Sequence, residues 1–424
     1  MRRVRTLALV LTAAAAVAAD SASAAPPTFA SSDGIQVASQ TALDPRLLSL
    51  TVTTGALDGS AGVRVLLPAD YAAHPKRHYP VLYLLHGTSG GAADWTTMGA
   101  AEETTAGRPL IVVMPDIAQH DNGGGWCTDS YNGGAYGPPE WETFHIDQLI
   151  PWIDRNLRTI AARRGRAIAG LSQGGFCAMS YGARHPDLFG SALSFSGAPD
   201  IAYDAEAQAL ATPVINATET GLDGVPPNSL FGPRATQEIN WAAHDPATLA
   251  ENLRGLGLVI YTGNGQSGPF DPPLPNPLGS VIEAGVNRLT TLFHARLQAL
   301  GIPSTFTDYG PGTHSWPYWK RDLQWSIGAV MDRFAHPSPV PAAVTYTSAD
   351  AAYTVFGWRV NIDRAVREFS TLRRAGRNGF TLAGSGSATV RTRLAMPGMP
   401  AIASPSTRPP RRRSGPRGPA GVGG

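Results

Sequence analysis

The chain of 424 residues has few of the features that support a metal site. It contains only two cysteines, Cys127 and Cys177, and two isolated cysteines do not give the paired spacing of a zinc or cluster site. Charged residues make up 16% of the chain, and no apolar run beyond the first 24 residues reaches membrane-spanning length. We therefore expect no metal, no cofactor and no stable membrane insertion.

The body of the chain also lacks the positive charge of a nucleic-acid binder. The formal net charge is +2, but residues 2–20 hold three arginines and one aspartate, and residues 393–424 hold six arginines and no acid. The remaining residues therefore carry a net charge of −6. A mildly acidic body argues against a nucleic-acid partner.

Both ends of the chain differ in composition from the middle. Residues 1–24 combine Arg2, Arg3 and Arg5 with an apolar run and small residues, which predicts a signal peptide cleaved near Ala24. We expect a secreted protein, extracellular or associated with a cell wall. Residues 25–336 form the expected main domain, residues 337–395 a small β-rich appendage, and the Pro-, Arg- and Gly-rich residues 396–424 a disordered tail.

The middle of the chain alternates between strand-like and helix-like segments. Such alternation predicts an α/β fold, with a mainly parallel sheet covered by helices on both faces. The segments at 47–54 and 63–68 are expected to be edge strands. The predicted inner strands span 81–87, 110–116, 166–171, 191–197, 256–263 and 304–310, and the predicted helices span 144–157, 281–301 and 316–334.

A serine lies between two glycines in the stretch RAIAGLSQGGFCAM, residues 166–179. In a chain with 47 glycines the pattern Gly-x-Ser-x-Gly is weak by itself. Here it follows a short apolar strand and precedes a helix-like segment, which is the context of a nucleophile elbow. Ser172 is therefore the candidate nucleophile.

A serine nucleophile requires a base and an acid. His314 lies in a glycine-rich turn after the last predicted strand, 142 residues beyond Ser172, and is the candidate base. Two carboxylates fit the acid. Asp271 follows the strand at 256–263, and Glu283 opens the helix before the last strand. Chain spacing alone leaves both open.

The loop HGTSGG, which begins at His86 after the apolar residues VLYLL, is suited to an oxyanion hole. Two backbone N–H groups are needed, and we expect them from Thr88 and from Gln173, which follows the nucleophile. His86 begins this loop, where we expect it to support the loop and border the substrate. The two cysteines of an exported chain form either a disulfide or two buried thiols.

Four motifs resemble the putative-esterase family of α/β-hydrolases, which includes S-formylglutathione hydrolase-like esterases and the antigen 85 mycolyltransferases. They are GLSQGGFCAMSYGARHPDLF, WETFHIDQLIPWI, LVIYTGNG and GPGTHSWPYW, within residues 45–335. The resemblance implies an α/β-hydrolase fold. It also implies Glu283 as the acid, 31 residues before His314, and Thr88 and Gln173 as oxyanion donors. It implies Trp316 as part of the acceptor-side wall.

One loop departs from the mycolyltransferase pattern. Those enzymes carry an Asp-Gly-Leu-Arg type loop whose charged residues help to bind trehalose, whereas this chain has His86-Gly87-Thr88-Ser89. We therefore expect a serine esterase that acts on small-molecule or lipid esters through an acyl-enzyme. The alternatives are an acyltransferase to a sugar or other alcohol, and a non-catalytic cell-wall binding protein on a hydrolase fold.

Overall fold

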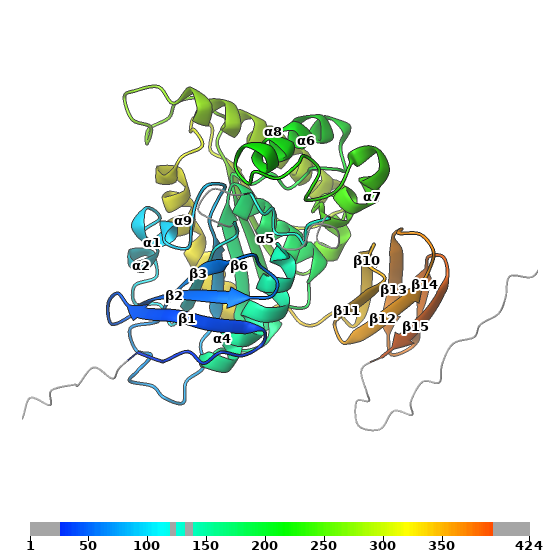
Figure 1. Ribbon diagram of the computed structural model, residues 1–424, viewed down its shortest axis with the longest axis horizontal. Coiled ribbons are helices and arrows are strands. Elements are labelled where there is room, and N and C mark those ends of the chain that lie inside the picture. Colours follow the sequence, from blue (N-terminus) through cyan, green and yellow to red (C-terminus); the bar gives the residue numbers. More distant parts are fainter. Residues whose placement is uncertain (1–25, 119–123, 132–138, 393–424) are drawn as a thin grey trace, which may run out of the picture.

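The computed structural model describes residues 26–118, 124–131 and 139–392. The predicted signal peptide and the predicted tail from residue 396 lie outside these residues. The main body is built on a nine-stranded sheet with the order β1-β2-β3-β5-β4-β6-β7-β8-β9 (Figure 1). The strands are β1 (Ile35–Ala42), β2 (Leu47–Thr54), β3 (Ser60–Leu66), β4 (Val81–Leu85), β5 (Ile111–Pro115), β6 (Arg166–Leu171), β7 (Ser191–Phe195), β8 (Gly257–Thr262) and β9 (Thr305–Asp308).

Helices connect and cover these strands. The α-helices of the described main body are α1 (Asp94–Thr97), α2 (Ala101–Thr104), α4 (Ile150–Asn156), α5 (Gln173–Arg184), α6 (Ala205–Gly221), α7 (Arg234–His244), α8 (Pro277–Ala299) and α9 (Trp316–Ala335). Three further helical segments are η1 (Thr143–Leu149), η2 (Arg163–Gly165) and η3 (Ala250–Leu253). The helix expected at 144–157 therefore has two parts, because its first half, η1, has π-helical geometry.

The sheet is mainly parallel, as expected. The strands from β5 through β4, β6, β7 and β8 to β9 pair in parallel, whereas the pairs β1–β2, β2–β3 and β3–β5 are antiparallel. The expectation that residues 47–54 and 63–68 form edge strands is wrong. Strand β1 pairs with β2 and takes the edge, so β2 and β3 each have two neighbouring strands.

Alternate side chains of the inner strands pack into two separate hydrophobic cores, one on each face of the sheet. In β4, Val81, Tyr83 and Leu85 face a core that includes Phe176 of α5, whereas Leu82 and Leu84 face a second core. The first core also holds residues of η1, α4 and α8, and the second holds residues of α1, α2 and α9. Both faces of the parallel sheet are therefore covered, which explains why these strands are continuous apolar runs.

The C-terminal residues form a separate β unit with its own core. One sheet has the order β10-β13-β14 and the other β11-β12-β15. The strands are β10 (Ala343–Ser348), β11 (Ala352–Val355), β12 (Trp358–Asp363), β13 (Ser370–Gly376), β14 (Gly379–Ala383) and β15 (Ser387–Arg391). Figure 1 shows this unit at one side of the main body.

The β unit is attached to the main body near the end of α5. Arg184 forms an ion pair with Asp350 at 3.2 Å, and the hydroxyl of Tyr346 donates to the backbone carbonyl of Arg184 at 2.6 Å. Asn252 exchanges two hydrogen bonds with the backbone of Thr347. These contacts tie the unit to the helix that follows Ser172.

Cys127 and Cys177 form a disulfide, with their Cα atoms 5.5 Å apart. Of the two alternatives left by the sequence, the structure therefore has the bond rather than two thiols. Cys177 lies in α5 and both cysteines are buried, so the bond fixes the loop around Cys127 to the helix behind Ser172.

We predict that replacing Cys127 and Cys177 together by alanine lowers the free energy of unfolding by about 2–4 kcal/mol. The bond joins residues separated by 50 positions, and its loss restores conformational freedom to the unfolded chain. Urea unfolding followed by tryptophan fluorescence measures the change, with the reduced wild-type protein as the matched control. An unchanged unfolding midpoint with an unchanged slope would contradict this prediction.

Candidate active site

Ser172 occupies a sharp turn between β6 and α5. Its backbone has φ 50° and ψ −124°, a region that non-glycine residues rarely adopt and that stores strain. Its N–H donates to the carbonyl of Phe195 at 2.9 Å, and its own carbonyl accepts from Gly175 and Phe176. The ends of β7 and α5 therefore hold the strained serine in place.

The two glycines of the motif are required by close backbone packing. A Cβ atom on Gly174 would lie 2.2 Å from the carbonyl oxygen of His86, and one on Gly170 would lie 2.3 Å from the carbonyl oxygen of Gly174. Both distances are far shorter than real contacts allow. Any side chain at either position would push α5 away from β4 and β6.

The side chains of Ser172, His314 and Glu283 form one hydrogen-bonded chain. The Nε2 atom of His314 lies 2.9 Å from Ser172 Oγ, and its Nδ1 atom lies 2.6 Å from Glu283 Oε2. The side chain of His314 is 9% exposed and that of Glu283 is fully buried. With Nδ1–H donating to the carboxylate, Nε2 is free to accept the serine proton, which is the geometry of general-base activation.

The other oxygen of Glu283 is fixed by three donors. Oε1 accepts from the hydroxyl of Ser196 at 2.8 Å, from the N–H of Gly263 at 2.7 Å and from the hydroxyl of Thr262 at 3.2 Å. Such bonds offset the cost of burying a carboxylate. Sequence reasoning missed Ser196, and its position directly after β7 is the only signal that points to it.

Asp271, the other candidate acid, forms hydrogen bonds with residues around His314 and not with His314 itself. Its carboxylate accepts from the hydroxyls of Thr313 and Tyr318, with the Tyr318 contact at 2.8 Å, and from the N–H of Gly268. Burial raises the pKa of Asp271, but the hydrogen bonds, that from Thr313 foremost, outweigh burial and lower it. Of the two candidate acids, the structure thus brings Glu283 to the imidazole, whereas Asp271 braces the residue before His314.

The expected oxyanion donors belong to segments that adjoin Ser172. Gln173 is the first residue of α5, where backbone N–H groups have no acceptor within the helix and the helix dipole is positive. Thr88 follows Gly87, and a Cβ on Gly87 would lie 3.1 Å from the Cβ of Ser172. The loop that carries Thr88 thus packs beside the serine, as an oxyanion hole requires.

His86 is buried below this loop. It is 1% exposed, its Nε2 accepts from the N–H of Ile117 at 3.0 Å, and its Nδ1 lies 2.7 Å from the carbonyl oxygen of Gly87. A carbonyl accepts only from a protonated nitrogen, so Nδ1 carries the hydrogen. This placement favours the loop-supporting role of His86 and leaves no ring nitrogen for the expected substrate contact.

Trp316 lies in an aromatic cluster next to His314. Its ring packs edge-on against those of Trp95, at 5.2 Å between centroids, and Trp319, at 5.4 Å. The Trp319 ring in turn lies 4.8 Å from the imidazole of His314. Trp316 and Trp319 thus form an aromatic cluster beside the catalytic histidine candidate, and the acceptor-side role of Trp316 stays a prediction.

A nucleophile elbow on a parallel sheet with a Ser–His–Glu chain defines the serine hydrolases of the α/β-hydrolase fold. A family model described as Putative esterase matches residues 54–328. That match covers more than half of the sequence, and the chain belongs to the Putative esterase family.

The relatives include esterases and acyltransferases. The chain is 35% identical over 283 residues to Esterase Rv1288 of Mycobacterium tuberculosis, covering 66% of this chain and 58% of that protein. It is 30% identical over 227 residues to the diacylglycerol acyltransferase/mycolyltransferase Ag85B of Mycolicibacterium smegmatis, covering 51% of this chain and 64% of that protein. The match therefore spans little more than half the length of the Rv1288 esterase.

Solved structures confirm the fold. MPT51 of Mycobacterium tuberculosis aligns with a TM-score of 0.54 at 23% identity, covering 67% of this chain and 97% of that one. An S-formylglutathione hydrolase from Agrobacterium tumefaciens aligns with a TM-score of 0.53 at 18% identity, covering 72% of this chain and 100% of that one.

Within the described ranges, no group of side chains has the makeup of a metal site and no helix is long and apolar enough to cross a membrane.

We predict that Glu283→Gln lowers kcat by about 10³–10⁴, because the amide no longer fixes the imidazole tautomer or stabilises the imidazolium. Asp271→Asn should lower kcat by less than about tenfold, since Asp271 bonds to Thr313, Tyr318 and Gly268 and not to the imidazole of His314. Steady-state hydrolysis of p-nitrophenyl acetate measures both, with circular dichroism to confirm folding. A larger loss for Asp271→Asn would reverse the assignment.

Proposed function

We propose that the protein is a secreted serine esterase that hydrolyses carboxylic esters through an acyl-enzyme. The observation that carries this proposal is the continuous chain from Ser172 Oγ through the imidazole of His314 to the buried carboxylate of Glu283. The family and its esterase and acyltransferase members support it. The N-terminal sequence and the disulfide support secretion, because disulfides persist in oxidising compartments.

In the proposed acylation, His314 Nε2 takes the proton of Ser172 as Oγ attacks the ester carbonyl. Glu283 stabilises the imidazolium that forms. The negative charge on the tetrahedral oxygen is held by the N–H groups of Thr88 and Gln173. The imidazolium then protonates the departing alcohol, and the acyl group remains on Ser172.

In the proposed deacylation, His314 accepts a proton from water as the water attacks the acyl-enzyme. The same oxyanion donors stabilise the second tetrahedral intermediate. When this collapses, the imidazolium returns its proton to Ser172 Oγ, and the carboxylic acid leaves. This sequence needs no group beyond the residues already named and one water molecule.

We predict that Ser172→Ala abolishes ester turnover, with a loss of several powers of ten in kcat, because no other group can form the acyl-enzyme. The variant should also fail to react with a fluorophosphonate that labels the wild-type protein. Ser196→Ala is a matched control, since it removes a neighbouring hydroxyl that donates to Glu283 and is not the proposed nucleophile, and it should keep labelling. A Ser172→Ala protein with more than about a tenth of wild-type activity would overturn the proposed nucleophile.

Acyl transfer to a sugar or another alcohol is the second candidate, favoured by the similarity to Ag85B. Transfer uses the same acyl-enzyme but needs an alcohol held in place of water. The loop after β4 offers no charged side chain for this purpose, because His86 is buried against the backbone and Ser89 is neutral. Hydrolysis is therefore the favoured outcome.

We predict that water outcompetes trehalose as acyl acceptor. Two missing charge-assisted hydrogen bonds, at roughly 1.5–3 kcal/mol each, weaken the binding of a disaccharide by about two to four powers of ten. Incubation with a short-chain ester and millimolar trehalose, followed by mass spectrometry of free acid and acylated sugar, measures the partition. If most of the product were acyl-trehalose, transfer would become the main function.

A further inference from the structure

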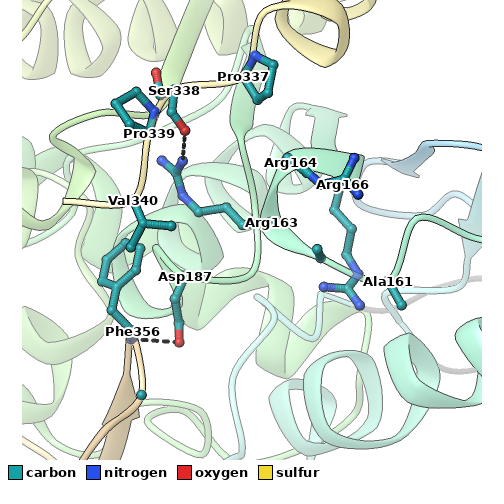
Figure 2. Close-up of a pocket in the computed structure, with 12 residues that line it drawn as sticks. Ala161, Arg163, Arg164, Arg166, Asp187, Pro337, Ser338, Pro339, Val340 and Phe356 are labelled. Atoms are coloured by element: carbon teal, nitrogen blue, oxygen red, sulfur yellow. Dashed lines mark hydrogen bonds between the residues drawn. The ribbon is translucent and has the colours of Figure 1, made fainter. Parts of the chain in front are cut away.

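A pocket of about 630 Å³ lies between the main body and the β unit, apart from the residues of the proposed active site. Its lining includes Arg163, Arg164 and Asp187 of the main body, the linker residues 337–340, and Phe356 of the turn between β11 and β12. Figure 2 shows Arg163 hydrogen-bonded to Ser338 and Asp187 hydrogen-bonded to Phe356 across this junction. The family match covers residues 54–328, so the linker and the β unit lie outside it.

Within the described ranges, no carboxylate forms a direct ion pair with Arg163. Its guanidinium donates to the carbonyls of Pro186 and Gly255, both at 2.8 Å, and more weakly to that of Ser338 at 3.5 Å. Burial lowers the pKa of Arg163, and the nearby charge of Arg333 lowers it further, while Asp187 acts in the opposite direction. Three of the five N–H donors of this guanidinium are thus used by backbone carbonyls, which are neutral and leave its charge at the pocket unbalanced.

The other charged groups around the pocket do not remove this excess. Arg166 is neutralised by an ion pair with Asp154. Arg164 is exposed and has no hydrogen bond or ion pair to any residue in the described part of the chain. Asp187 is the acidic residue of the lining, and one of its oxygens already accepts from the N–H of Phe356 at 2.9 Å. The lining therefore keeps a net positive charge.

The pocket also offers apolar surface. Phe356 is half-buried there, with the Arg163 guanidinium 5.8 Å from its ring centre, and Pro337, Pro339 and Val340 add further carbon surface. A sugar ring packs its C–H groups on such surfaces, and guanidinium groups bind carboxylate or phosphate with fixed geometry. The volume lies in the range of pockets for one small ligand, whereas a membrane or a nucleic acid needs an extended face.

We propose that this pocket binds an anionic saccharide, a sugar unit bearing a phosphate or a carboxylate. The anion lies against Arg163 and Arg164, and the ring of the sugar packs on Phe356 and the prolines of the linker. Because the lining comes from the main body, the linker and the β unit, the bound sugar also ties these parts together. This site does not depend on the proposed esterase activity.

Isothermal titration calorimetry on the whole protein tests the proposal with glucose 1-phosphate, glucuronate, glucose and inorganic phosphate as probes. We expect both anionic sugars to bind more tightly than glucose and inorganic phosphate. Whichever of the two binds better shows whether phosphate or carboxylate is the preferred anion. Arg164→Gln should weaken their binding about tenfold or more, because it removes a charge-assisted contact.

Arg108→Gln is the matched control, since Arg108 is an exposed arginine outside the pocket and its replacement makes the same change in net charge. It should leave the affinities unchanged. Equal binding of glucose and its anionic relatives would overturn the charge-based part of the proposal. Inorganic phosphate binding as tightly as glucose 1-phosphate would overturn the saccharide part. Affinities unaltered by Arg164→Gln, or lowered equally by Arg108→Gln, would overturn the site itself.

Discussion

The close approach of α5 to the end of β4 is the constraint on which the site depends. Only hydrogen atoms at Gly170 and Gly174 allow it, since a Cβ on Gly174 would meet the carbonyl of His86 at 2.2 Å. The approach forces the chain to reverse within one residue, which places Ser172 at φ 50°. It also brings the first N–H of α5 next to the loop after β4, so nucleophile and oxyanion donors arise from the same packing.

The buried carboxylate of Glu283 shows how the rest of the sheet supports this elbow. An isolated charge would be costly at a fully buried position. Here Oε1 is satisfied by groups at the ends of β7 and β8, and Oε2 by His314, whose loop follows β9. The segments at the carboxyl ends of β7, β8 and β9 thus each supply one partner of this carboxylate. In α/β folds, functional groups gather at this edge of the sheet.

The sequence predicted the parts of the fold that have strong local patterns. The buried parallel strands are continuous apolar runs, and the elbow has its own glycine pattern, so both were predictable. Strand β1 was not, because IQVASQTA lies at the sheet edge and alternates weakly. The choice between Glu283 and Asp271 could not be made from spacing, since both follow strand β8 and only the fold decides which one reaches His314. The role of Ser196 depends on contacts across 87 residues, which no local pattern encodes.

Helix α5 joins the elbow to the C-terminal β unit. Ser172 precedes its first residue, Cys177 anchors its middle, and Arg184 at its end contacts both Glu142 and Asp350. Burial alone would raise the pKa of Glu142, but the charge of Arg184 and the hydrogen bond from His185 outweigh it, so the carboxylate stays charged. Without the β unit, Arg184 would retain its ion pair with Glu142 but lose its ion pair with Asp350. Its backbone carbonyl would also lose the hydrogen bond from the hydroxyl of Tyr346. Because removing one partner from a buried charge network is destabilising, we expect the β unit to stabilise the end of the helix that carries the elbow.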